Sequence, residues 1–224
     1  MEELEAVFTS MTRCRSIPAL WWAGRTGMTM SVESRRSPER NARAGLLRFL
    51  SRVFLRELDD DFFRVLQRPE VGEALIKADP AITEFLAGEW SPEDQEEAAV
   101  EFCRLFIVPG ACLPVACAWL ERTGEGKAAA PDGAVAGVVR KLIESLEFSL
   151  GADLKSAPPD HISVVLEIAA WLEVEADAAD SREFQSAVLR TWAPPFAREL
   201  SRVAQHPVYR AAGRLLDEAL KWEN

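Results

Sequence analysis

The segment Ile162–Val174 constrains the fold of this chain more strongly than any other stretch. Ten of its thirteen residues are apolar, and only Ser163, Glu167 and Glu173 interrupt them. A helix that is apolar on nearly every side has to be covered by other elements, as the central helix of a helical protein is. The pattern therefore predicts a buried central helix with further helices packed around it.

Two prolines, Pro158 and Pro159, stand just before this segment. Proline fixes its own φ and disfavours helix at the residue before it, so the pair predicts a stiff hinge near residues 151–160. Asp160 follows, with an oxygen that can accept from free N–H groups at a helix start. We therefore expect Asp160 and His161 at the mouth of the central helix. Residue types alone favour a plainer interpretation, in which Asp160 only starts a helix and His161 is solvated.

The rest of the chain is helical in pattern as well. Apolar residues recur at three- and four-residue steps, as in Ala44–Leu66, and no run alternates in the manner of a strand. The predicted fold is all-α, a single bundle-like domain of about nine to eleven helices over residues 41–224. Residues 1–40 keep no such period, so we predict a poorly ordered N-terminal extension there.

Composition describes a soluble protein with an acidic surface. Hydrophobic residues make up 48% and charged residues 28% of the 224 residues. No apolar run reaches the ~20 residues of a membrane-spanning helix, so we expect a cytoplasmic protein without stable membrane insertion. The net charge of −10 disfavours binding to nucleic acid and is compatible with a basic peptide as partner. A net charge of this size is also common among soluble proteins, in which it only prevents aggregation.

The residues do not assemble a recognisable catalytic or metal-binding pattern. The four cysteines form no Cys-x-x-Cys pair, and the two histidines lie far apart in sequence, so we expect neither a metal nor a cofactor. Asp160 and His161 are adjacent, and adjacent residues on a helix point in different directions. With no nucleophile or metal to complete a mechanism, we do not expect an enzyme.

Three motifs resemble those of the TorD/DmsD family. Pro158–Ile162, running into the central helix, is similar to the family's Pro-x-Asp-His-hydrophobic motif. Glu101–Ile107 resembles its acidic-aromatic-x-x-Leu-Phe helix end. Trp192–Phe196 and Gln205–Arg210 resemble its C-terminal Trp-x-Pro-x-Phe and His/Pro-Phe-Tyr-Arg features. The three matches occur in the family's order and together are fairly specific.

This resemblance implies a dedicated cytoplasmic chaperone. Such a chaperone would bind the basic twin-arginine signal peptide of a molybdenum-cofactor oxidoreductase precursor, assist cofactor insertion and delay export. It would hold no cofactor itself, and it would be a monomer or a domain-swapped dimer. Asp160 would be the anion for the peptide's arginines, and His161 would donate to the peptide backbone and respond to pH. The expected apolar wall of the site comprises Leu105, Phe106, Pro114 and Trp119.

Two departures from the family pattern affect the expected site. Ala157 stands where the family usually has an acidic residue, and the loop after Leu113-Pro114 is shortened. Two other functions therefore stay open. One is an assembly chaperone of the nitrate reductase delta-subunit type, which acts on a target without an export signal. The other is a helical adaptor unrelated to redox enzymes.

Overall fold

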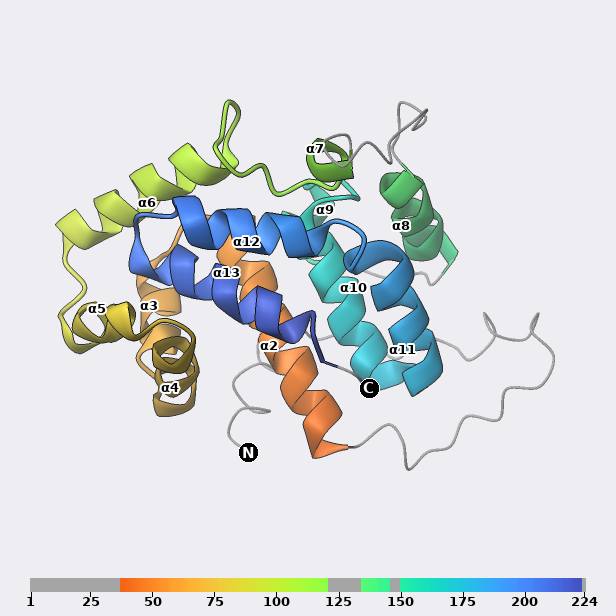
Figure 1. Ribbon diagram of the computed structural model, residues 1–224, viewed down its shortest axis with the longest axis horizontal. Coiled ribbons are helices and arrows are strands. Elements are labelled where there is room, and N and C mark those ends of the chain that lie inside the picture. The colour runs from red at the N-terminus through yellow and green to blue at the C-terminus, as the bar shows by residue number, and fades with distance from the viewer. Residues whose placement is uncertain (1–36, 121–133, 146–149, 223–224) are drawn as a thin grey trace. The chain divides into compact units, whose positions relative to one another are not determined.

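The computed structural model describes residues 37–120, 134–145 and 150–222 (Figure 1). Across these ranges there are twelve α-helices, one 3₁₀-helix and one π-helix, and no strand; an isolated bridge pairs Val115 with His161. The predicted all-α class is confirmed. In chain order the elements are α2 (Pro38–Leu55), α3 (Asp60–Leu66), α4 (Pro69–Ala78), the 3₁₀-helix η3 (Pro80–Ile82), α5 (Thr83–Ala87), α6 (Pro92–Phe106), α7 (Cys117–Leu120), α8 (Ala134–Ser145), α9 (Ala152–Lys155), α10 (Ile162–Glu175), α11 (Ala178–Phe184), the π-helix η4 (Gln185–Leu189), α12 (Ala193–Val203) and α13 (Pro207–Ala219).

The chain divides into two compact units. Unit 1 comprises residues 1–51, 115–189 and 224, and unit 2 comprises residues 52–114 and 190–223. The helix α2 begins at Pro38, whereas residues 1–36, most of the predicted extension, lie outside the described residues. The predicted division into an extension over 1–40 and one domain over 41–224 therefore stays a prediction.

The predicted central helix is α10, in unit 1. Eleven of its fourteen residues are buried, and both α11 and η4 pack against it. On the α2 side, the Ser51 hydroxyl donates to the carbonyl of Ser163 at 2.9 Å. A helix with so little exposed surface gains its stability from packing on several sides rather than from one apolar stripe.

The two glutamates that interrupt the apolar pattern of α10 face arginines of α2. Arg48 Nε lies 3.5 Å from Glu167 Oε1, and Arg40 Nε lies 3.5 Å from Glu173 Oε2. Arg40 also donates to the carbonyl oxygens of Leu172, at 3.1 Å, and Ala176, at 2.8 Å. Burial raises the pKa of Glu167, and the charge of Arg48 opposes that effect. The polar interruptions in the sequence therefore mark the places where α2 packs on the central helix.

In unit 2, α13 packs against α12 and α4. The close approach of α12 and α13 depends on Gly213, since a Cβ there would lie 2.6 Å from Ser201 Oγ and 3.0 Å from the carbonyl oxygen of Ala197. The sequence pattern predicts that Pro194-Pro195 interrupts a helix, and the chain does break there, at residues 190–192 between η4 and α12. The prolines lie in the first turn of α12, where a missing N–H removes no helical hydrogen bond.

Candidate functional site

The Asp160–His161 pair lies where the proline hinge meets α10, but the residue that caps α10 is His161 and not Asp160. His161 is the N-cap of α10, and its Nδ1 accepts from the backbone N–H of Ser163 at 3.2 Å. Asp160 instead contacts the first residue of α7, since its Oδ2 accepts from the backbone N–H of Cys117 at 3.2 Å. The Asp160 carbonyl also accepts from the backbone N–H of Ala116 at 3.1 Å. The prediction that Asp160 caps the central helix is therefore wrong: it holds the start of a different helix.

These contacts join the first family motif to the loop that departs from the family pattern. The bridge between Val115 and His161 ties the loop after Pro114 to the hinge, although the residues that meet are 43 or more positions apart. Asp160 is buried, with 7% of its surface exposed, and within the described ranges it makes no ion pair. One oxygen of its carboxylate thus accepts from a single backbone N–H, and no arginine in these ranges neutralises it.

Both histidines act as neutral acceptors at helix starts. His206 is the N-cap of α13, and its Nδ1 accepts from the backbone N–H of Val208 at 3.3 Å. Burial lowers the pKa of His161 to about 4 against the charge of Asp160, and burial likewise lowers the pKa of His206 to about 4. An imidazole whose Nδ1 accepts a hydrogen bond cannot be protonated on Nδ1 without losing that bond, so protonation of the ring is disfavoured. Any response of His161 to pH therefore lies well below neutral.

We expect the protein to lose stability as the pH falls from about 6.5 toward about 4. The unfolded histidines bind protons from about pH 6.5 downward, and the folded ones resist protonation until about pH 4. Between about pH 7.5 and pH 5.5 this lowers the free energy of unfolding by about 1 kcal/mol for each histidine. The raised pKa of Glu167 acts in the opposite direction. Urea unfolding at pH 7.5 and at pH 5.5 measures the difference in the free energy of unfolding.

The control for this prediction is His206→Asn, which keeps an N-cap acceptor and removes the titrating group. We expect this variant to lose about half of the pH dependence. Equal free energies of unfolding for the parent protein at the two pH values would contradict the assignment of neutral, buried histidines.

The residues predicted to form the apolar wall of the site are buried. Leu105 is 0% exposed, Phe106 and Trp119 are each 5% exposed, and Pro114 is also buried. The ring of Phe106 packs edge-on against Phe54 at a centroid distance of 5.9 Å. These side chains are core residues in this structure. Their role as the ligand wall stays a prediction.

The units separate the predicted site residues into two groups. Asp160, His161 and Trp119 belong to unit 1, and Leu105, Phe106 and Pro114 belong to unit 2. The backbone contacts of the hinge bring Asp160 and His161 to the loop that leads into α7, on which Trp119 lies. Within unit 2, Leu105 and Phe106 are neighbours on the buried side of α6.

Glu101, the acidic residue of the second motif, is the centre of a polar joint that sequence reasoning missed. Its carboxylate accepts from Arg104 Nε at 2.5 Å and from the backbone N–H groups of Gln205 and His206 at 2.6 and 3.3 Å. Burial alone would raise the pKa of Glu101, but these hydrogen bonds outweigh it and lower the pKa. The joint connects the second motif to the third. The two motifs are about 100 residues apart in the sequence, so their sequence patterns do not predict this contact.

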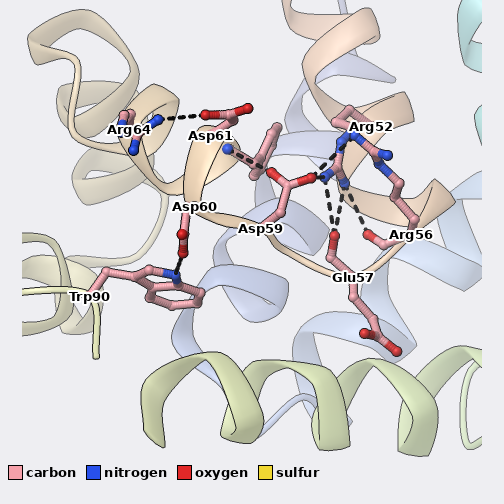
Figure 2. Close-up of polar contacts among 9 residues, drawn as sticks. Arg52, Arg56, Glu57, Asp59, Asp60, Asp61, Arg64 and Trp90 are labelled. Atoms are coloured by element: carbon pink, nitrogen blue, oxygen red, sulfur yellow. Dashed lines mark hydrogen bonds and ion pairs between the residues drawn. The ribbon is translucent and has the colours of Figure 1, made fainter. Parts of the chain in front are cut away.

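A second polar cluster surrounds the start of α3 (Figure 2). Asp59 caps α3 through the N–H of Phe62, and Arg52 Nη2 lies 2.8 Å from its carboxylate. Figure 2 also shows Asp60 meeting the indole N–H of Trp90, at 3.1 Å, and Asp61 meeting Arg64. Asp59 and Asp60 therefore bind groups of the fold, and Asp61 forms a surface ion pair with Arg64. All three consecutive aspartates have partners within unit 2.

Neither a metal site nor a membrane span is found in the part of the chain that the structure covers. Those residues hold no group of three or more His, Cys, Asp or Glu side chains placed to bind a metal ion. None of the helices in these ranges combines the length and apolar character that crossing a membrane requires.

Comparison with known proteins places this all-helical chain in a family. The family model described as "Nitrate reductase delta subunit" matches residues 67–198, more than half of the sequence, and the chain belongs to this family. The chain is also similar to curated proteins named "Chaperone protein TorD". That of Shewanella loihica is 27% identical over 190 residues, which cover 80% of this chain and 90% of the relative. That of Colwellia psychrerythraea is 27% identical over 216 residues, covering 83% of this chain and 91% of the relative.

A solved structure from Archaeoglobus fulgidus, titled as a redox enzyme maturation protein, is 21% identical with a TM-score of 0.47, and the match covers 88% of this chain and 100% of that one. The curated relatives confirm the resemblance to TorD that the three motifs carry. They also confirm the prediction that the chain is not an enzyme, since they are chaperones by name.

Proposed function

We propose that this protein is a cytoplasmic chaperone for the precursor of a molybdenum-cofactor oxidoreductase, and that it binds the precursor's twin-arginine signal peptide. The observation that carries the proposal is the similarity to TorD chaperones along about nine-tenths of their length. A net charge of −10 supports a basic partner, because complementary charge speeds encounter and disfavours wrong partners. By occupying the leader, the chaperone would delay export while the cofactor is inserted.

The hinge is the first place where this function can be tested. One oxygen of Asp160 accepts from the N–H of Cys117, and a carboxylate has about four acceptor positions in all. Capacity therefore remains for a guanidinium group, whose hydrogen bonds to a carboxylate are strong and directional. His161 adds a neutral imidazole beside it.

Asp160→Asn is expected to weaken the binding of a synthetic twin-arginine leader by about 1–3 kcal/mol. Asparagine keeps an oxygen that can accept from the N–H of Cys117, so the variant removes the charge and preserves the local fold. The measurement is a titration of labelled leader at low and high salt, and the parent protein should lose affinity as salt rises.

The matched control is Asp61→Asn, which removes one negative charge from the exposed surface of unit 2. This control should bind the leader as the parent does. Parental affinity in Asp160→Asn would remove Asp160 from the peptide site.

A second candidate function follows from the description of the matching family. That family is described as "Nitrate reductase delta subunit", and the resemblance drawn from the sequence implies that an assembly chaperone of this type would bind its target enzyme without an export signal. Precursor and leaderless forms of the same target distinguish the two candidates. Loss of binding on removal of the leader supports the first function, and equal binding of both forms supports the second.

A further inference from the structure

Exposed apolar side chains gather on one short stretch of unit 2. Four large hydrophobic residues are exposed in the described part of the chain. Three of them, Val100 at 61%, Ile107 at 54% and Val108 at 77%, lie on α6 or directly after it. The fourth, Val138, lies on α8 in unit 1. Scattered exposed hydrophobics need no explanation, whereas three of these four lie within nine residues of one another in sequence.

The outward face of α6 changes character along its length. At about 3.6 residues per turn, residues three, four and seven positions from Val100 share its side of the helix. Toward the N-terminus that face carries the exposed acids Glu93, Glu96 and Glu97, and toward the C-terminus it carries the exposed Cys103 and the half-buried Arg104. Ile107 and Val108 follow directly after the helix, where the backbone of Ile107 is extended. The exposed surface is therefore acidic along the first turns of α6, and its apolar residues lie toward the end of the helix and just past it.

The acids of this face are available to a partner. Glu93, Glu96 and Glu97 have no ion-pair partner among the described residues. The cation on this side of α6, Arg104, is occupied by Glu101 and by the carbonyl oxygen of Val203, at 2.7 Å.

A fourth acid extends the anionic surface beside α6. Glu57 lies in the cluster of Figure 2, where its side chain points toward α6 and away from the arginines. Its carboxylate contacts the thiol of Cys103 at 3.8 Å, whereas Asp59 nearby is engaged by Arg52 and Arg56. Glu57 makes no ion pair in the described ranges, so it adds charge that a bound cation could meet.

We infer that the outward face of α6, together with Ile107 and Val108, is the docking surface for the leader of the target precursor. The basic residues of the leader would lie against Glu93, Glu96 and Glu97, and its apolar segment would cover Val100, Ile107 and Val108. This inference rests on the proposed function and places the leader on α6 instead of at the hinge. Parental affinity in Asp160→Asn combined with weaker binding by the α6 variants supports this placement, and the reverse result overturns it. The order of charge and apolar surface along α6 matches the basic-then-apolar order of an export leader.

Other occupants fit this face less well. An anionic membrane surface would be repelled by the glutamates. A second copy docked antiparallel would place each acidic half against the partner's apolar half, and a parallel copy would oppose acid to acid. A partner that is both cationic and apolar satisfies both halves of the face.

The test uses the full-length chain and a synthetic peptide with two arginines followed by about 15 apolar residues. The double variant Val100→Ser/Ile107→Ser should weaken binding about tenfold, because apolar contact is lost. Glu96→Lys/Glu97→Lys should weaken it by at least as much and flatten its salt dependence. The matched controls, Val138→Ser and Glu218→Lys, alter exposed residues elsewhere and should bind as the parent does.

A second measurement does not depend on any variant. Cys103 and Cys117 are both exposed, and Cys103 lies in the proposed surface. Bound leader should slow the alkylation of Cys103 and leave that of Cys117 unchanged. If the leader binds the parent and both double variants equally, and Cys103 stays reactive, the docking surface is wrong while the proposed function stands. If the parent does not bind the leader at all, both are overturned.

Discussion

Replacing Glu101 with alanine is expected to lower the free energy of unfolding by about 3–5 kcal/mol. Glu101 is 6% exposed, and its carboxylate accepts from Arg104 and from the backbone N–H groups of Gln205 and His206. Alanine would leave those two N–H groups without their acceptor, and Arg104 would keep only the carbonyl oxygen of Val203. An unsatisfied buried donor costs more than an average hydrogen bond contributes.

Urea denaturation measures the free energy of unfolding of Glu101→Ala, and Glu97→Ala is the matched control on the same helix. Glu97 is one turn earlier on α6, is exposed and makes no ion pair in the described ranges, so its loss should change the free energy by less than about 0.5 kcal/mol. The loss of unfolding free energy in Glu101→Gln should lie between those of the two alanine variants, since an amide oxygen can still accept from the N–H of Gln205. A cost below about 1 kcal/mol for Glu101→Ala would contradict the role of Glu101 as a joint.

Replacing Glu173 with alanine is expected to be similarly costly, by about 3–5 kcal/mol. Glu173 is 1% exposed, and one of its oxygens accepts from the Ser181 hydroxyl at 2.6 Å and from Gln185 Nε2 at 2.7 Å. Its other oxygen faces the buried guanidinium of Arg40. Alanine would therefore remove the counter-charge of the buried Arg40, which keeps only carbonyl oxygens as acceptors, and would remove the acceptor of Ser181 and Gln185.

The matched control for this variant is Glu175→Ala at the exposed end of α10. Its unfolding free energy should stay within about 0.5 kcal/mol of the parent value. A double-mutant cycle with Arg40→Met measures how much of the Glu173 effect passes through the ion pair. Additive effects of the two substitutions would show that Ser181 and Gln185, rather than Arg40, account for the loss.

The sequence supports predictions that depend on local pattern. The period and near-continuous apolar character of Ile162–Val174 predicted a buried central helix, and α10 is that helix. The Ser91-Pro92 start of α6 also follows from local chemistry, because the Ser91 hydroxyl accepts from the N–H of Asp94. Such features involve residues within one turn of each other, so a single stretch of sequence contains all the interacting groups.

Contacts between distant segments could not be predicted in the same way. A capping aspartate was expected after the prolines, but which helix Asp160 caps depends on a loop 43 residues earlier in the chain. Likewise, the apolar stripe on α6 predicts that Leu105 and Phe106 are buried without saying what covers them. A ligand wall and a core residue have the same sequence pattern, and only burial separates them.

The family motifs therefore explain part of the fold as well as part of the proposed function. Glu101 joins the second motif to the third, and Asp160 joins the hinge to the loop before α7. Glu101 is buried in its joint, so direct contacts of a peptide near the second motif are expected on exposed neighbours of Glu101. For the second motif those neighbours include Val100 and Ile107.

Titration of the protein with a twin-arginine leader, and with the same peptide carrying alanine at both arginines, tests the central claim most directly. We predict saturable binding of the first peptide that weakens as salt rises, and at least tenfold weaker binding of the second. Equal affinity for the two peptides, or no binding of either, would contradict a chaperone that recognises a basic leader.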